Sequence, residues 1–386
     1  MARTALYLLL LAAIAPYLYD RYVSVSNMLA NRPSKFTPIY NIKSHEFKFQ
    51  DRLKNCEDVL LDEGSGLAIL SCDPGRDRWN TVMGVFARAK GHRSGQLYLW
   101  DYSTPNLPST EALRPIVLEN FPHGDDFHPL GIEYDASTST LYVISHMLPH
   151  SVIEIFSLAP TTATATYLKT FQHDLIHAPN SIHTVGAGKL YVTIDHYFQA
   201  RTWPLLSKIE TFAGPPLAGV IFVDINEPAS ARYVARVPFA NGIAGINETS
   251  VVVASSSKSG LYFYTRDPVT QDLRYERLVR TPAAVDNISV DRQGRVLAAG
   301  HPYALELVAT AEGREGCVEG SLEEGEQRAC GCAAPSWAAE WSEEAGLRVL
   351  YMGREFCTSS SVVRDVGRGV GVVGGLYGRG VMVFRE

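Results

Sequence analysis

Clustered positive charge and several common catalytic motifs are absent from this sequence. Its 35 Lys and Arg residues are scattered along 386 residues, and the formal net charge is −6. Nucleic-acid-binding proteins present a basic face, so this class of function is excluded. No G-x-S-x-G, H-E-x-x-H or phosphate-binding loop occurs, so a serine α/β-hydrolase, the commonest type of zinc protease and a P-loop enzyme lack sequence support.

Charged residues are also few, at 20%, whereas 46% of the residues are hydrophobic. This composition excludes a disordered or fibrous chain and allows a large core. The abundant Gly (31) and Pro (21) are typical of a turn-rich β-protein. We see no long amphipathic helix after the N-terminal segment.

Long hydrophobic runs are confined to the N-terminus, where residues 5–18 lie between Arg3 and the pair Asp20-Arg21. The run is short for a membrane span and has the length of a signal-peptide core. No clear small-x-small cleavage site follows it, so residues 1–22 are interpreted as a cleaved signal peptide or as an uncleaved anchor. Both place the chain in the secretory pathway, either secreted or membrane-anchored on the lumenal or extracellular side. The anchor would also give membrane association.

The six cysteines are an even number, which is typical of disulfides in an oxidising compartment. Cys56 and Cys72 flank a strand–turn–strand pattern and are equidistant from its turn at 63–66, which predicts a cross-strand disulfide. The alternatives are two unpaired buried thiols, or a bond from Cys56 to Cys357 that closes the fold. The sequence does not define the pairing of the other four, which bracket a Glu- and Gly-rich surface insertion within about 303–357: Cys317, Cys330, Cys332 and Cys357.

A hairpin pattern recurs six times along the chain. Each copy has a polar or small residue, a short strand, a turn with Gly or Asp, and a β-branched strand; the copies span 57–72, 131–146, 180–196, 241–257, 287–301 and 360–375. This repeat predicts an all-β, six-bladed β-propeller over 45–386, because radial stacking buries both faces of each small sheet. We expect the N-terminal part of the fold to lie beside the C-terminal strands and close the ring. A double β-sandwich explains the strands but not the repeated hairpin.

Four of the repeats open with carboxylate or amide side chains. In a propeller the first strand of each blade follows the central channel, so these side chains should converge there. An all-oxygen set is typical of calcium and not of zinc or copper. Singly, each residue also has an ordinary structural interpretation as a turn, cap or loop residue. The set comprises Glu57-Asp58, Asn180, Asn241 and Asp286-Asn287.

Two glycosylation sequons are present, at Asn247-Glu248-Thr249 and Asn287-Ile288-Ser289. We expect a glycan on Asn247 only.

The sequence resembles the paraoxonase/arylesterase family at these positions. Two segments are specific to that family, DHYF at 195–198 and VDNISVD at 285–291. Weaker matches lie in the same order between residues 50 and 302, whereas the region after His301 matches poorly. The hydrophobic N-terminus is also similar to the family's signal-like segment.

The resemblance implies a catalytic calcium at the bottom of the channel, held by Glu57, Asn180, Asn241, Asp286 and Asn287. It also implies a second, structural calcium that uses Asp58 and the backbone carbonyl of Ile132. The family has an acidic residue directly after its first ligand Asn, and this chain has Ser181 there.

The family's histidine pair is incomplete in this sequence. His146 matches the second member, but Leu130 occupies the position that matches the first, with His128 two residues upstream. The catalytic candidates are therefore His146 and Asp286, where Asp286 would act as base or nucleophile besides binding calcium. His128, His196 and His301 are expected to contact the metal ligands or the substrate, and His146 has the alternative of a packed residue at a strand end.

The function implied by the resemblance is calcium-dependent hydrolysis of small-molecule lactones and aryl esters. One alternative is a non-catalytic propeller in which calcium is a structural pin. Another is a six-bladed enzyme similar to gluconolactonase or strictosidine synthase, which DHYF and VDNISVD disfavour. A calcium ion is the expected cofactor in the first two cases.

Overall fold

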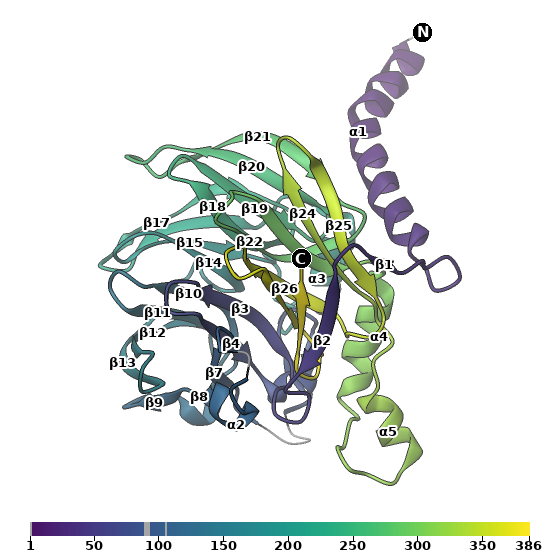
Figure 1. Cartoon of the computed structure of the whole chain (residues 1–386). Coiled ribbons are helices and arrows are strands. Elements are labelled where there is room, and N and C mark those ends of the chain that lie inside the picture. Colours follow the sequence, from purple (N-terminus) through teal and green to yellow (C-terminus); the bar gives the residue numbers. More distant parts are fainter. Residues whose placement is uncertain (1, 89–92, 105) are drawn as a thin grey trace.

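A computed structural model describes residues 2–88, 93–104 and 106–386. In this part of the chain, six sheets of four or five strands stand around a central axis and form a six-bladed β-propeller (Figure 1). The fold class predicted from the repeats is confirmed, and the inner strand of every blade begins within three residues of a predicted repeat start.

The first three blades follow the chain order with one exception, a short strand β9 that adds to the outer edge of the second sheet in parallel. Their strands are β3 (Cys56–Asp62), β4 (Leu67–Cys72), β7 (Gln96–Asp101) and β8 (Leu113–Pro115); β10 (Pro129–Asp135), β11 (Thr140–Ser145), β12 (Val152–Ala159), β13 (Thr164–Phe171) and β9 (Val117–Glu119); and β14 (Pro179–Gly186), β15 (Lys189–Ile194), β16 (Gly219–Asp224) and β17 (Glu227–Arg236).

The last three blades use the two N-terminal strands as outer strands. Their strands are β18 (Ala240–Asn247), β19 (Ser250–Ser255), β20 (Gly260–Arg266) and β21 (Leu273–Arg280); β22 (Ala284–Val290), β23 (Val296–His301), β24 (Ser336–Ser342), β25 (Gly346–Gly353) and β1 (Ile39–Tyr40); and β26 (Ser359–Asp365), β27 (Val370–Gly375), β28 (Val381–Arg385) and β2 (Ser44–Lys48).

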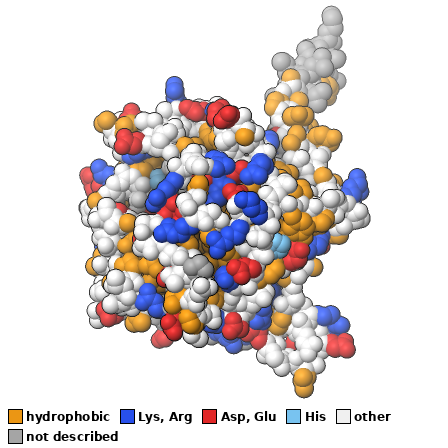
Figure 2. All heavy atoms as spheres, viewed as in Figure 1, with side chains coloured by type: hydrophobic (Ala, Val, Ile, Leu, Met, Phe, Trp, Pro, Cys, Tyr) orange, Lys and Arg blue, Asp and Glu red, His pale blue; other side chains and the backbone are white. Residues whose placement is uncertain are grey.

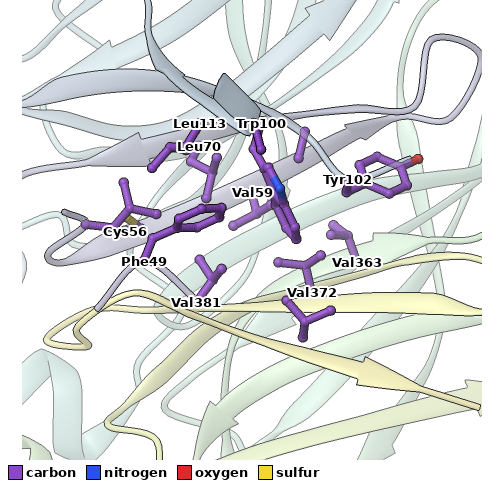
Figure 3. Close-up of a cluster of buried hydrophobic side chains, with 14 of the residues drawn as sticks. Phe49, Cys56, Val59, Leu70, Trp100, Tyr102, Leu113, Val363, Val372 and Val381 are labelled. Atoms are coloured by element: carbon purple, nitrogen blue, oxygen red, sulfur yellow. The ribbon is translucent and has the colours of Figure 1, made fainter. Parts of the chain in front are cut away.

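The ring closes between the two ends of the chain, as expected. Strand β2 pairs antiparallel with β28, from Ser44 opposite Arg385 to Lys48 opposite Val381. A buried cluster then joins the first blade to the last, with Phe49 and Trp100 packed near Val372 and Val381 (Figure 3). Closure therefore buries both the apolar faces of these two blades and the edge of β28.

Further elements lie outside the blade sheets, mostly in loops that connect two strands of one blade. They are the 3-10 turns η1 (Pro74–Asp77) and η3 (Gly124–Asp126), the hairpin of β5 (Trp79–Asn80) with β6 (Val85–Phe86), and the helices α1 (Ala2–Ala30), α2 (Ser109–Ala112), α3 (Pro204–Ala213), α4 (Ala304–Arg314) and α5 (Glu324–Cys330). Helices α1, α3, α4 and α5 lie on the same side of the propeller (Figure 1).

Helix α1 extends eight residues beyond the predicted N-terminal segment. Among the described residues, no helix combines the length and apolarity that crossing a membrane requires. Near its C-terminal end α1 contacts the fourth blade, where Asp20 pairs with Lys258 and Arg280.

Three disulfides link the six cysteines. The predicted Cys56–Cys72 bond is present, with Cα atoms 3.8 Å apart and the two residues opposite each other across β3 and β4. The other pairs are Cys317–Cys330 and Cys332–Cys357. Helices α4 and α5 occupy the first part of the expected insertion, whereas β24 and β25, in its second part, complete the fifth blade.

Candidate metal centre and cavity

The inner strand of every blade has a β-bulge close to its first residue. The register shifts between Cys56 and Asp58 in β3, and similar shifts occur at 129–132, 179–182, 240–243, 285–288 and 359–361. All five residues predicted to hold the catalytic calcium lie in four of these bulges. A bulge leaves residues unpaired and re-aims their side chains, which directs these groups into the channel.

Glycines next to two of the bulges allow neighbouring strands to approach closely. A Cβ on Gly131 would lie 2.3 Å from the carbonyl oxygen of Asn180, and one on Gly242 would lie 2.7 Å from the Cα of Asn287. Real Cβ atoms do not occupy such positions, so only glycine permits these contacts between adjacent blades. The close packing fixes where the two asparagines lie.

The structure brings the five predicted residues together on the helix-bearing side of the channel. Glu57, Asn180, Asn241 and Asp286 line one cavity of about 1090 Å³, a volume that includes its open mouth. Asn287 reaches the same place, because its Nδ2 donates a hydrogen bond of 2.7 Å to Oε1 of Glu57. Blades one, three, four and five therefore contribute to a single site.

Four oxygens of this site are buried and have no hydrogen-bond partner among the described residues. They are Glu57 Oε2, Asn180 Oδ1, Asn241 Oδ1 and Asn287 Oδ1. An unpaired buried acceptor costs about 1–3 kcal/mol, so four in one place call for a ligand. Carboxylate and amide oxygens are the donors that Ca²⁺ prefers, and these residues fit a calcium ion.

The described histidine and cysteine side chains do not form a competing site. No group of three or more His, Cys, Asp or Glu side chains in the described part of the chain is arranged to hold a metal ion. The fit to a cation therefore combines the carboxylate of Glu57 with the three asparagine oxygens, an all-oxygen set as expected for a hard metal.

Burial and like charges make the site attractive to a cation. The pKa of Glu57 is raised well above its ordinary value, first by burial and then by the charges of Asp58 and Asp286. Burial also raises the pKa of Asp58 to about 7. A bound cation would offset the repulsion within this acidic group.

The residues implied for a second calcium give a different result. The two carboxylate oxygens of Asp58 accept backbone N–H bonds from Val59 (2.9 Å) and Ile132 (3.0 Å). Ser181 brings no carboxylate, and its N–H donates to Thr193 Oγ1 at 2.9 Å. Asp58 and Ser181 therefore lack the unpaired oxygens of the first site, and the second ion stays a prediction.

His146 is enclosed by protein groups. Its Nε2 donates to the carbonyl of Pro179 at 2.8 Å, and its Nδ1 contacts the hydroxyl of Thr81. Burial lowers the pKa of His146 to about 4, so the ring is neutral at pH 7. His146 is not among the described residues that line the cavity, whereas Leu130 is.

Of the other three predicted histidines, His301 lines the cavity, whereas His128 and His196 are held by other residues. His301 lines the cavity, and its Nε2 lies 2.8 Å from Oδ2 of Asp286. His128 is paired with Asp73 at 2.9 Å, and His196 lies between Asp195 (2.8 Å) and Thr211 (2.7 Å). Only His301 of these three is among the described cavity-lining residues.

Helices supply cavity residues that the sequence motifs did not indicate. Val25 and Met28 come from α1, Phe212 from α3, and Leu307 and Val308 from α4. For α4 a signal was present, since apolar residues recur at helical spacing directly after His301-Pro302.

The two sequons differ in accessibility. Asn287 is buried at the site, which excludes a glycan there, whereas Asn247 is exposed at the end of β18. The expectation of a glycan on Asn247 remains a prediction.

Comparisons with known proteins agree with this geometry. The model of the Arylesterase family matches residues 83–315. The chain is 30% identical over 220 residues to human serum paraoxonase/lactonase 3, covering 55% of this chain and 59% of the relative. It is 29% identical over 253 residues to the mouse protein of that name, covering 63% and 66%. The chain thus spans about three fifths of the length of these curated relatives.

Solved structures support the fold alone. A putative gluconolactonase matches with a TM-score of 0.50 and 13% identity, covering 89% of this chain and 94% of the other. A gluconolactonase from Xanthomonas campestris matches with a TM-score of 0.51 and 12% identity, covering 89% and 90%. Because the family model covers more than half of the sequence, the chain belongs to the arylesterase family.

Proposed function

We propose that this protein is a calcium-dependent hydrolase of carboxylic esters that acts on lactones and aryl esters. The observation that carries the proposal is the set of four unpaired buried oxygens at the base of an apolar cavity. Glu57, Asn180, Asn241, Asp286 and Asn287 would hold the calcium. When bound, the ion would polarise the substrate carbonyl and stabilise the oxyanion that forms when water attacks.

We assign proton transfer to the pair of Asp286 and His301. Both line the cavity, and the His301 Nδ1 atom has no hydrogen-bond partner among the described residues. The pair can accept a proton from the attacking water and return it to the leaving alkoxide. His146, whose ring nitrogens both contact protein atoms, would position Pro179 beside the ligand Asn180.

Leu130 and its neighbours would exclude water from the reacting ester. Leu130, Val82, Met83 and Phe239 line the cavity and present apolar atoms to it. An apolar wall above polar ligands suits an uncharged ester or lactone.

The proposal is tested by measuring hydrolysis of phenyl acetate and of a δ-lactone with and without a calcium chelator. We expect chelation to abolish both activities and added calcium to restore them. If the protein binds calcium but hydrolyses neither compound, it is a non-catalytic propeller in which calcium only stabilises the fold.

We also propose that the protein enters the secretory pathway and associates with membranes through its N-terminal segment. Three disulfides suit an oxidising compartment. Exposed apolar residues of α1 include Tyr17, Leu18 and Tyr22, and Figure 2 shows hydrophobic side chains on the part of this helix nearer the propeller. Flotation of the full chain with lipid vesicles tests this, and a chain that stays unbound contradicts it.

A further inference from the structure

The central channel continues beyond the candidate metal centre, along the inner strands and away from the cavity described above. A second cavity, the polar channel, lies there and has a volume of about 900 Å³ that includes its open mouth. All six inner strands contribute to its lining, through residues that follow the first residues of the bulges. These residues lie within 58–63, 132–133, 181–183, 243–245, 287–290 and 361–364.

A layer of predicted ligands separates the two cavities. Glu57 and Asn180 line the first cavity, whereas their chain neighbours Asp58 and Ser181 line the polar channel. Asn287 also lines the polar channel, and its Nδ2 donates to Oε1 of Glu57 at 2.7 Å. The candidate metal centre therefore borders a cavity on each side.

The polar channel has the charge that attracts a cation. Carboxylates of Asp58, Glu63 and Glu133 line it, and Glu63 pairs with Arg292 at 2.9 Å. Arg364 also lines it, but its guanidinium is paired with three carboxylates: those of Asp291, Glu340 and Glu386. Carboxylates thus outnumber cations along the polar channel, and such a lining raises the local concentration of cations.

The α1 side of the first cavity has the opposite charge. Arg21 lines this cavity, and Lys258 lies within the lining segment 256–259. Arg21, Lys258 and Arg280 all pair with a single carboxylate, that of Asp20, so positive charge is in excess in this cluster. The apolar walls add the cost of removing water from a charged ion. This side therefore suits an uncharged ester and opposes the entry of calcium.

We propose that calcium reaches and leaves the candidate metal centre through the polar channel, whereas the ester enters through the first cavity. The inference rests on the calcium site of the proposed function. Separate entrances would let calcium exchange while a substrate occupies the first cavity.

His183 and Glu133 are placed to control this route. His183 on β14 and Glu133 on β10 line the polar channel, and Nδ1 of His183 lies 3.3 Å from Oε1 of Glu133. A Cβ on Gly245 of β18 would lie 2.5 Å from Nε2 of His183. The imidazole thus extends between the inner strands of the second, third and fourth blades, where a larger ring would narrow the channel.

The first test measures calcium release from the calcium-loaded full chain after mixing with an excess of fluorescent calcium chelator. His183→Trp should slow release by about 10-fold or more, whereas the equilibrium affinity should change by less than about 3-fold, because an obstacle on the path raises the barrier equally for binding and release. Val25→Trp is the matched control, since Val25 lines the first cavity and is 48% exposed. It should leave the release rate within about 2-fold of the wild type.

The second test removes charge without adding bulk. In Glu133→Gln the side-chain carbonyl can still accept the Thr184 N–H, which donates to Glu133 at 2.9 Å. The calcium association rate should fall by about 3-fold at about 10 mM salt, and the effect should vanish at about 1 M, where charges are screened within about 3 Å. Glu312→Gln is the matched control, because Glu312 is an exposed residue of α4 on the helix-bearing side, and it should leave the rate unchanged.

The outcomes separate this inference from the proposed function. If Val25→Trp slows release as much as His183→Trp or more, or if neither does so, the polar channel is not the route. If His183→Trp fails to fold, Glu133→Gln decides the question, and an association rate unchanged at low salt overturns the proposal. If the wild type binds no calcium, the proposed function itself is wrong.

Discussion

Replacement of Glu57 by Gln should separate calcium binding from the cost of a buried charge. Glu57 is 1% exposed, and Oε1 of its carboxylate accepts a bond from Asn287 while Oε2 has no partner among the described residues. If the Gln carbonyl keeps the bond from Asn287, its amide N–H groups occupy the position of Oε2. The substitution therefore removes one negative charge and turns a predicted metal ligand into a hydrogen-bond donor at nearly constant volume.

The wild-type response to calcium can be estimated from linkage. Free calcium at 100 times its dissociation constant adds about 2.7 kcal/mol to the free energy of unfolding. With an unfolding entropy of about 2.1 cal/mol/K per residue over 386 residues, the unfolding midpoint rises by about 3 °C. In Glu57→Gln this rise should fall below about 2 °C at the same calcium concentration, because a 10-fold loss of affinity leaves only about 1.4 kcal/mol of stabilisation.

Without calcium, the same variant should unfold at the wild-type temperature or higher. The substitution removes a buried carboxylate that Asp58 and Asp286 repel, and an uncompensated buried charge is destabilising. An ordinary loss of packing would have the opposite sign. The measurement is thermal unfolding followed by circular dichroism, with chelator and with excess calcium.

Glu154→Gln is the matched control for this experiment. Glu154 is also fully buried, and one of its carboxylate oxygens lacks a partner among the described residues. Unlike Glu57, it lies on β12 in the second blade and is not among the described residues that line the cavity. This variant should keep the full calcium-dependent rise. A rise of about 3 °C in Glu57→Gln, or its loss in both variants, would refute Glu57 as a calcium ligand.

Four further outcomes are expected. Asp286→Ala should lower kcat/KM for phenyl acetate by about 100-fold or more, because a predicted ligand and a proposed proton acceptor are lost together, whereas Leu130→Ala should cost less than about 10-fold. His146→Gln should also cost less than about 10-fold and leave the pH–rate profile unchanged, since a true general base contributes 100-fold or more. Burial raises the folded-state pKa of Glu154 to about 7 from its ordinary 4.5, so its stabilising contribution is complete below pH 4.5 and is lost as the pH rises to 7; Glu154→Gln should remove this part of the pH dependence of unfolding. Asn247→Gln should lower the mass of the protein produced in a host that glycosylates secretory proteins by one glycan, which mass spectrometry detects.

The architecture was predictable because its determinants are local and repeated. Each blade begins with the same hairpin pattern. In the first blade Cys56 and Cys72 lie at equal distances from the turn, so the hairpin predicted both the pairing of the two strands and the disulfide between them. The pairing of Cys317, Cys330, Cys332 and Cys357 was not predictable, since it depends on how an irregular insertion folds back on the propeller. Helix α3 was missed as well, although Pro204 at its first turn and Gly214 at its left-handed C-cap (φ 64°) are helix start and stop signals.

The site also has a part that the sequence predicted and a part that it did not. The predicted ligands form the floor of the cavity, and apolar residues, many of them on helices, form its walls. The predicted ligands come from bulges at equivalent places in the inner strands, and packing around the propeller axis dictates where those strands begin. Asn287 of the fifth blade hydrogen-bonds Glu57 of the first across the channel, so the floor is a consequence of ring closure itself. The apolar walls include residues of α1, α3 and α4. Helix α1 precedes the blades, whereas α3 and α4 lie between the second and third strands of the third and fifth blades, where the repeat does not constrain them. The predicted ligands could therefore be found from the repeat, whereas the apolar walls, including Val25, Phe212 and Val308, could be found only from the three-dimensional positions of the helices.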